Sequence, residues 1–294
     1  MRRDQGGRDE WKAQVSGAVM GSMGEKKKTI TLGFSPCPND TLIFNGLVNG
    51  SVCPAGWDIR EQLHDVETLN EMAFEEKLDV TKLSFYAWLK VKEHYRLLNS
   101  GGALGFGCGP VVISQKPLTA ADMDACRIAL PGRWTTAHLL FRLWAPRADN
   151  RLFVPYDRIF ETLQAGRADC GVIIHESRFT YEKQGFRQVI DLGAWWEENS
   201  GGPIPLGCIA AHKRIGTDLA AQMDDAIQKS IQSAQADPAM ALPYIRTHAQ
   251  EMAADVLDAH IRTFVNAFSL DLGDKGRSAV AALESAARET GILP

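Results

Sequence analysis

The stretch TITLGFSPCPNDTLIFNGLVNG, residues 29–50, decides the fold class. Its first six residues predict a short buried strand, the next seven a loop, and the remainder a helix that ends at Gly50. The same alternation of strand, loop and helix recurs along the chain. It predicts an α/β fold with a mainly parallel sheet.

Outward from this stretch, the chain divides into two α/β units and a helical tail. We predict that the second unit is inserted into the first, with PVVIS (110–114) and PLGCIAA (205–211) as the two crossings between two lobes. The predicted amino-terminal extension, residues 1–28, has no fixed structure. The predicted first lobe is discontinuous and consists of residues 29–112 and 207–294, which include the helical tail. Residues 113–206 form the predicted second lobe.

Composition narrows the class of protein. The 294 residues are 45% hydrophobic, carry a formal net charge of -4 and contain no apolar run long enough to span a membrane. We therefore expect neither nucleic acid nor membrane as a partner, and no export signal is recognisable, so we expect a cytoplasmic protein. The oligomeric state is not predicted.

Cofactor and metal signatures are missing from the sequence. The six cysteines form no CxxC pair and are expected to be reduced, mostly buried thiols. GGALGFGCGP (101–110) resembles a dinucleotide fingerprint, but a strand-like VVIS follows it where a helix would be needed. We read it as a flexible turn, and we expect no cofactor and no metal.

Three predicted strand-to-helix turns are rich in hydroxyl residues: SPCPNDT (35–41), TKLS (81–84) and GRWTTA (132–137). Two interpretations stay open. Such residues cap helices, and the same geometry offers free N–H groups to an anion such as a carboxylate. Because ligands of open α/β sheets bind beyond the carboxyl ends of the strands, all three turns are expected to face one cleft. Ser35 and Asn39 of the first turn are candidate ligand contacts.

His175 is the candidate catalytic residue. It ends the apolar segment CGVII, where side chains can project into a cleft, and an imidazole suits a general base. The alternative is a partly buried histidine satisfied by a carbonyl. Glu176 is expected on the opposite face of the strand, and the other six histidines at the surface. A nucleophilic pair of Cys37 with His175 is possible in principle but not favoured by the spacing.

Taken together, these motifs resemble one family. The segments SPCPNDTLIF, DVETLN, TKLS, LPGRWTTAHLL, GVIIHESRFTYEKQG, VIDLGAWWEE, PLGCI and RTFVNAFSLDLG, in that order, are similar to 1,4-dihydroxy-6-naphthoate synthases of menaquinone biosynthesis. The resemblance runs from residue 29 to about residue 290. SPCPNDT and IIHESRFTY are the most distinctive motifs.

The resemblance implies a periplasmic-binding-protein-like fold of type 2, with two hinge strands. It implies a cofactor-free lyase that converts cyclic dehypoxanthine futalosine, a small-molecule carboxylate, to 1,4-dihydroxy-6-naphthoate in the futalosine route. The family's proton-accepting histidine falls on His175, and its substrate contacts fall on Lys82, Leu83, Ser84, Thr136 and Ala137. The alternatives are a solute-binding protein of the same fold and chorismate dehydratase.

Overall fold

The computed structural model describes residues 27–249 and 253–294. Residues 1–26 of the predicted extension therefore lie outside the described residues. Lys28, which the sequence analysis placed in the extension, is the first residue of strand β1 (Lys28–Phe34).

The first sheet gathers strands from both ends of the chain, in the order β2-β1-β3-β11-β4 with β5 paired to β11. Besides β1 its strands are β2 (Trp57–Leu63), β3 (Val80–Ser84), β4 (Tyr95–Leu97), β5 (Ala103–Gly105) and β11 (Ile204–His212). Strand β1 runs parallel to β2 and β3, whereas β11 runs antiparallel to β3, β4 and β5.

The second sheet comes from the middle of the chain, in the order β10-β6-β9-β7-β8. Its strands are β6 (Val111–Ser114), β7 (Ile128–Leu130), β8 (Arg151–Phe153), β9 (Cys170–Ile173) and β10 (Arg187–Asp191). Strand β7 is parallel to β8 and β9, while β6 is antiparallel to β9 and β10. Both sheets are therefore mixed, and the prediction of a mainly parallel sheet was wrong. The antiparallel strands β6 and β11 are those next to the crossings between lobes.

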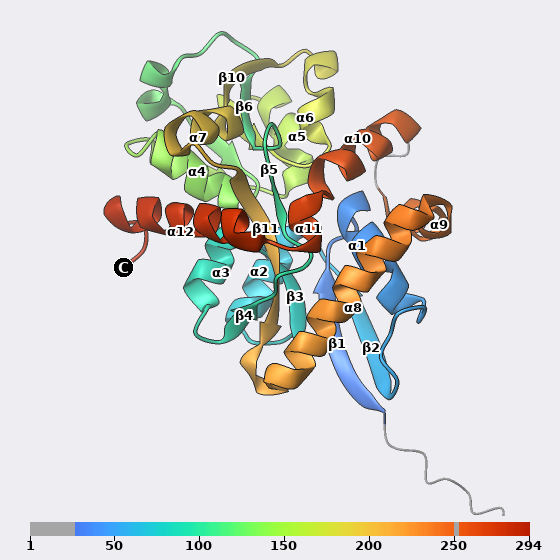
Figure 1. Ribbon diagram of the computed structural model, residues 1–294. Coiled ribbons are helices and arrows are strands. Elements are labelled where there is room, and N and C mark those ends of the chain that lie inside the picture. Colours follow the sequence, from blue (N-terminus) through green and yellow to red (C-terminus); the bar gives the residue numbers. More distant parts are fainter. Residues whose placement is uncertain (1–26, 250–252) are drawn as a thin grey trace, which may run out of the picture.

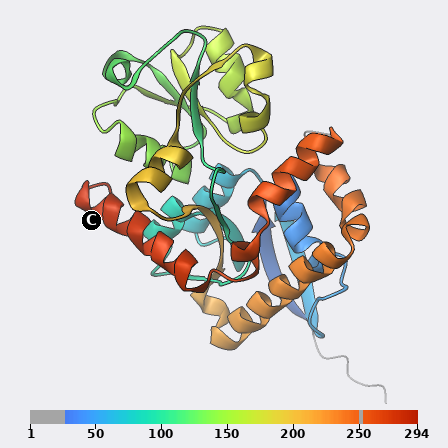
Figure 2. The ribbon, with the colours of Figure 1, turned by 45° about the horizontal axis from the view of Figure 1, so that its top comes forward.

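Twelve helices cover the two sheets in the part of the chain that the structure describes. Their bounds are α1 (Pro38–Val48), α2 (Val66–Phe74), α3 (Phe85–Val91), α4 (Thr136–Trp144), α5 (Ile159–Gln164), α6 (Ser177–Thr180), α7 (Leu192–Ser200), α8 (Thr217–Ala236), α9 (Pro238–His248), α10 (Ala254–Phe264), α11 (Ala267–Leu270) and α12 (Gly273–Glu289). The two lobes lie one above the other in Figure 1, and Figure 2 separates them more clearly.

The helical tail packs on elements of the first lobe. Helices α8 and α9 pack against α1. Helix α12 contacts β11 of the first sheet and also α4 of the second lobe. The core of the first lobe joins apolar side chains of β1, α1 and α8, among them Ile30, Phe34, Phe44, Ile227 and Ile231. Burial of such side chains is the main force that holds the tail in place.

The chain crosses between the sheets twice, between β5 and β6 and between α7 and β11. PVVIS contains strand β6 of the second sheet and PLGCIAA lies within strand β11 of the first sheet, so each of the two segments lies directly beside one of the crossings. The partner of β11 next to the crossing is β5, within the segment expected to be a flexible turn. Gly109 and Gly193 let the chain pass closely here, since a Cβ on Gly109 would lie 2.2 Å from the Cα of Gly193.

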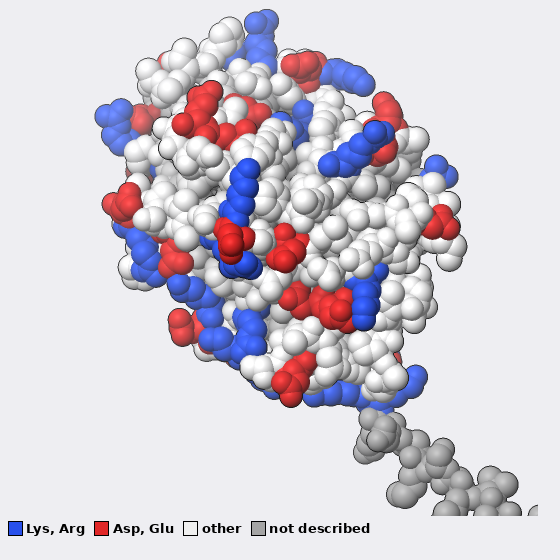
Figure 3. Space-filling model, viewed as in Figure 1, with Lys and Arg blue, Asp and Glu red and all other residues white. Residues whose placement is uncertain are grey.

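Acidic and basic side chains are intermingled over the face seen in Figure 3. Among the described residues no helix is long and apolar enough to cross a membrane. All six cysteines are free, as expected, and all but Cys53 are buried.

Candidate active site

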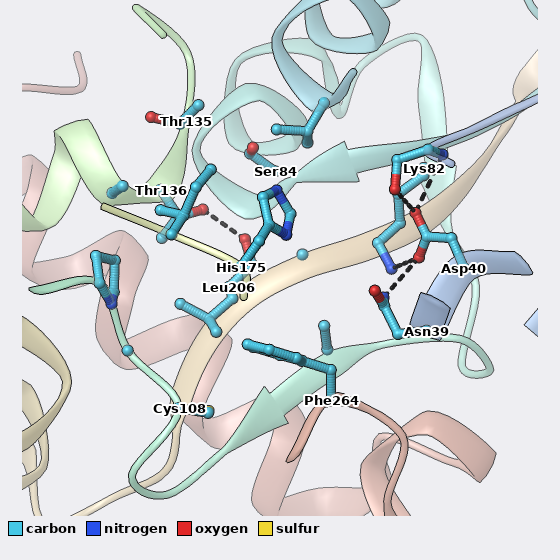
Figure 4. A pocket seen from close by; sticks show the side chains of 18 residues that line it. Asn39, Asp40, Lys82, Ser84, Cys108, Thr135, Thr136, His175, Leu206 and Phe264 are labelled. Carbon is cyan, nitrogen blue, oxygen red and sulfur yellow. Dashed lines mark hydrogen bonds and ion pairs between the residues drawn. The ribbon is translucent and has the colours of Figure 1, made fainter. Parts of the chain in front are cut away.

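A pocket lies between the two lobes, with about 660 Å³ of space that is partly open to solvent. Figure 4 shows the side chains of the 18 residues that line it. All of the predicted site residues except Leu83 are among them: Ser35, Asn39, Lys82, Ser84, Thr136, Ala137 and His175. The side chain of Leu83 is instead buried in the apolar core.

The three hydroxyl-rich turns meet at this pocket, as expected, but few of their side chains cap helices. Thr135 caps α4, accepting a hydrogen bond from the N–H of His138. Cys37 and Ser84, at the cap positions of α1 and α3, make no capping hydrogen bond with their side chains. The capping interpretation therefore holds for Thr135, while the other polar side chains have different partners.

A buried ion pair lines the pocket on the side of the first lobe. Lys82 Nζ lies 2.6 Å from Asp40 Oδ1, and the two side chains are 6% and 2% exposed. The Asp40 carboxylate also accepts hydrogen bonds from Asn39 Nδ2 and from both the N–H and the hydroxyl of Ser35. Sequence analysis treated Asp40 only as a cap-type residue. The structure makes it the acceptor that holds Lys82 and Asn39 in place (Figure 4), and Ser35 is held by the same carboxylate.

Ser84 is held in place by one neighbour. Asn70 accepts from the N–H of Ser84 at 2.9 Å and donates to its hydroxyl oxygen at 3.1 Å. Because the hydroxyl oxygen already accepts, its proton is free to be donated into the pocket. Asn70 was not singled out from the sequence.

The hydroxyl of Thr136 joins the two lobes. It donates to the carbonyl oxygen of Leu206 on β11 at 2.7 Å and accepts from the N–H of Tyr86 on α3 at 3.3 Å. This hydroxyl is therefore already engaged. The backbone N–H groups of Thr136 and Ala137 are in the first turn of α4, where helical N–H groups have no partner within the helix. These groups suit a carboxylate.

A second hydrogen-bonded contact joins the two lobes. The Glu67 carboxylate on α2 accepts from the N–H of Trp134, with distances of 2.9 and 3.0 Å to its two oxygens. Gly132 permits this approach, because a Cβ there would lie 2.5 Å from the Glu67 carboxyl carbon, and its φ of 154° is one that favours glycine.

His175 lies beyond the end of its strand and lines the pocket from there. Strand β9 ends at Ile173, and His175 adopts a left-handed backbone conformation with φ of 56°. The strand argument that placed Glu176 on the opposite face therefore does not apply. Non-glycine residues with such backbone angles are uncommon and concentrate at functional sites.

Cys37 contacts a ring nitrogen of His175, and the Tyr156 ring lies edge-on to the same imidazole, 4.9 Å away between ring centroids. The Sγ of Cys37 lies 3.7 Å from Nδ1 of His175, although the spacing of these two residues in the sequence gave no reason to favour the pair. Burial, reinforced by the charges of Glu176 and Asp40, raises the pKa of the Cys37 thiol far above its usual range. The thiol therefore stays protonated near neutral pH, which makes it unsuitable as a nucleophile.

His260 on α10 is a neighbour that the sequence analysis missed. Its ring lies 6.2 Å from that of His175 and is stacked on it, and its Nε2 lies 2.8 Å from Asn39 Oδ1. His138 and His212 are buried as well, so the expectation of surface positions was wrong for these three. A signal was present: Leu257, His260 and Phe264 share the spacing of a buried helix face.

The site keeps its histidines neutral. Burial lowers the pKa of His175, and Lys82 adds to this, while the negative charges of Glu176 and Asp40 oppose it. Burial together with His175 and Lys82 lowers the pKa of His260 to about 3. A neutral imidazole over a pocket with one buried ammonium group and free helix N–H groups can accept a proton from a molecule that these groups hold by its carboxylate.

No metal site accompanies this arrangement in the described residues. They contain no group of three or more histidine, cysteine, aspartate or glutamate side chains placed to hold a metal ion.

Fold and site together define a two-lobed α/β protein with a pocket between its lobes that is lined by a histidine. Solved structures of similar fold include a protein from Archaeoglobus fulgidus, with a TM-score of 0.85, 29% identity and coverage of 90% of this chain and 98% of that one. The alkanesulfonate-binding protein SsuA from Xanthomonas axonopodis has a TM-score of 0.69 at 15% identity, covering 90% and 94%. The second likeness concerns the fold alone.

Sequence relatives identify the family. A family model described as menaquinone biosynthesis matches residues 30–289. The chain is 48% identical to the 1,4-dihydroxy-6-naphthoate synthase of Thermus thermophilus, over 90% of this chain and 96% of that one. The synthase of Streptomyces coelicolor is 39% identical over 90% and 95%. The chain belongs to the 1,4-dihydroxy-6-naphthoate synthase family of menaquinone biosynthesis enzymes, as the sequence motifs indicated.

Proposed function

We propose that this enzyme is a cytoplasmic, cofactor-free lyase that converts cyclic dehypoxanthine futalosine to 1,4-dihydroxy-6-naphthoate, with His175 as general base. The observation that carries the proposal is the position of the His175 ring. It lines the interlobe pocket from a left-handed backbone conformation, with Cys37 at Nδ1. No partner for its Nε2 is found among the described residues.

The pocket offers separate places for the two ends of such a substrate. Lys82, the hydroxyl of Ser84 and the N–H groups that begin α4 are suited to its carboxylate. Ile174, Leu206 and Phe264 supply apolar surface for the ring system. In this arrangement both lobes hold the substrate, so lobe closure excludes water from the reacting atoms.

The base is available because His175 is neutral. For Nε2 to accept a proton, Nδ1 must carry the ring proton, and the sulfur of Cys37 is placed to accept it as a weak hydrogen bond. Nε2 then takes a proton from the bound substrate. The electron pair left behind drives cleavage of the bond to the sugar-derived part, which leaves as the naphthoate becomes aromatic. The negative charges of Glu176 and Asp40 favour the imidazolium that forms.

Incubation of the purified protein with cyclic dehypoxanthine futalosine, followed by chromatography, tests the proposal. We expect 1,4-dihydroxy-6-naphthoate to accumulate with many turnovers per protein molecule. Binding without turnover would support a solute-binding protein, and consumption of chorismate in a parallel incubation would support chorismate dehydratase. Either result would refute the proposed reaction.

The pH dependence tests the base separately. We expect kcat/KM to rise with pH on the acid side, with a midpoint below the ordinary histidine value of about 6.5, because burial lowers the pKa of His175. A limb that rises only well above pH 7 would point to a different base.

A further inference from the structure

A second hollow lies outside the interlobe pocket and shares no lining residue with it. It has about 860 Å³ of space, partly open to solvent, and both lobes contribute to it. Its polar and aromatic lining includes Lys90, Arg133, Trp134, His138, Arg142 and Arg151, and we call it the basic groove.

Cations outnumber carboxylates in the basic groove. Lys90, Arg133, Arg142 and Arg151 line it together with a single acidic residue, Asp149. In residues 27–249 and 253–294, none of the four cations forms an ion pair. Their contacts are with rings and neutral oxygens: Lys90 lies over Trp134, Arg142 donates to the Tyr86 hydroxyl, and Arg151 donates to a carbonyl. By contrast, Arg147 nearby is paired with Asp124 at 2.8 Å.

The positive charges in the basic groove repel one another, and this repulsion affects the pKa values of two of them. Burial lowers the pKa values of both Lys90 and Arg151, and the positive charge of Arg142 lowers both further. Crowded cations that are partly removed from water and lack counter-ions destabilise each other, and a bound anion relieves this repulsion.

A buried histidine adds a second, independent requirement. His138 is 5% exposed, and its Nδ1 lies 2.7 Å from the carbonyl oxygen of Arg133. Because a carbonyl only accepts, Nδ1 carries the proton and Nε2 is an acceptor. That Nε2 is buried without a partner among the described residues, and burial lowers the pKa of the ring to about 4. A buried acceptor without a partner is costly, and a ligand hydroxyl would satisfy it.

From this geometry we propose that the basic groove is a second ligand site that takes a phosphorylated small molecule. A phosphate group carries more than one negative charge near neutral pH, which matches four cations against one carboxylate. Arginine guanidinium groups bind phosphate oxygens in pairs. A hydroxyl on the phosphate or beside it supplies the donor that His138 lacks.

The site has a structural consequence, because its cations come from two lobes. Lys90 lies on α3 of the first lobe, whereas Arg142 lies on α4 and Arg151 on β8 of the second. Trp134, which also lines the groove and lies under Lys90, donates its backbone N–H to Glu67 of the first lobe. A phosphorylated ligand in the basic groove therefore bridges the lobes and stabilises their closed arrangement.

The test is a titration of the full-length protein with sodium pyrophosphate at constant ionic strength, followed by tryptophan fluorescence and calorimetry, with orthophosphate as a second arm. We expect one saturable site. Arg142→Gln, Arg151→Gln and Lys90→Gln should each weaken binding about tenfold or more, because each removes a charge-assisted contact. Tighter binding of pyrophosphate than of orthophosphate indicates a ligand with linked phosphates, whereas equal binding indicates a single phosphate group.

Two controls make the outcome decisive. Arg147→Gln removes a nearby arginine that is paired with Asp124 outside the groove, and it should leave the affinity unchanged. Ser84→Ala alters the interlobe pocket and should also leave it unchanged. No saturable binding up to millimolar pyrophosphate, or equal losses in Arg147→Gln and the groove variants, would overturn the proposal. Loss of binding in Ser84→Ala would place the anion in the interlobe pocket and would overturn it as well.

Discussion

Removing the charge of Lys82 isolates the free-energy contribution of the buried Lys82–Asp40 ion pair in the interlobe pocket. Lys82→Met keeps the length of the side chain but leaves the Asp40 carboxylate, 2% exposed, without its cation. Loss of one partner of a buried ion pair costs about 3–5 kcal/mol. Because Ser35 and Asn39 still donate three hydrogen bonds to the carboxylate, we expect a loss near the lower end, about 3 kcal/mol of unfolding free energy.

A double variant separates the charge from the packing. Lys82→Met with Asp40→Asn removes both charges, so the loss should shrink to about 1–2 kcal/mol, the cost of imperfect hydrogen bonds. The matched control is Lys229→Met. Lys229 lies at the same 2.6 Å from Asp225, but both side chains are more than half exposed. The control should cost no more than about 1 kcal/mol.

The assay is urea unfolding followed by circular dichroism, with substrate affinity measured on the same samples. Stability should recover in the double variant while substrate affinity stays low, because Lys82 is still absent. A double variant as unstable as Lys82→Met alone would show that the loss does not come from an uncompensated carboxylate. That result would refute the reasoning.

Three further outcomes test neighbouring parts of the site. Cys37→Ala should lower kcat by no more than about tenfold, because its weak contact only orients the His175 ring; a fall of about 10⁴ or more in single-turnover kinetics would indicate a nucleophile. Ser84→Ala should weaken substrate binding, measured by calorimetry, by ~1–3 kcal/mol, and an affinity equal to that of the parent would remove Ser84 from the binding site. Thr136→Val should mainly lower the unfolding free energy, by about 1 kcal/mol, because the Thr136 hydroxyl donates to the carbonyl oxygen of Leu206. Burial lowers the pKa of His138 in the folded protein to about 4, whereas the same histidine in the unfolded chain takes up a proton as the pH falls below about 6.5. The free energy of unfolding therefore decreases between about pH 6.5 and pH 4, by about 2 kcal/mol at pH 5. His138→Phe should remove that share of the acid sensitivity in urea unfolding at pH 7.5 and 5, and an unchanged pH dependence would contradict the neutral, buried histidine.

The sequence predicted the elements that carry strong local patterns. Strands such as TITLGF and helices with apolar spacing were recognisable, and the three hydroxyl-rich turns were expected to meet at one cleft because parallel strands present their carboxyl ends together. Strand β5 was missed, because Ala103–Gly105 lies in a glycine-rich segment without alternation, and its pairing with β11 is set by residues a hundred positions away.

The side-chain partners within the site depended on tertiary structure. Thr136 was expected to contact the substrate, but the contact between the lobes commits its hydroxyl to the carbonyl oxygen of Leu206. Cys37 and His175 are 138 positions apart, so their contact left no local signal in the sequence. The left-handed backbone of His175 had no signal either, because that conformation is set by the packing around the end of β9 rather than by a glycine.

The central claim is that His175 takes the proton, and turnover by the His175→Asn variant tests it most directly. Asparagine tolerates the left-handed backbone at this position and keeps a hydrogen-bonding side chain, but it cannot accept the proton. We predict that kcat for formation of 1,4-dihydroxy-6-naphthoate falls by ~10²–10⁴, the usual effect of losing a positioned base, while the variant still binds substrate. A folded His175→Asn enzyme that turns over within a few-fold of the parent would contradict the account.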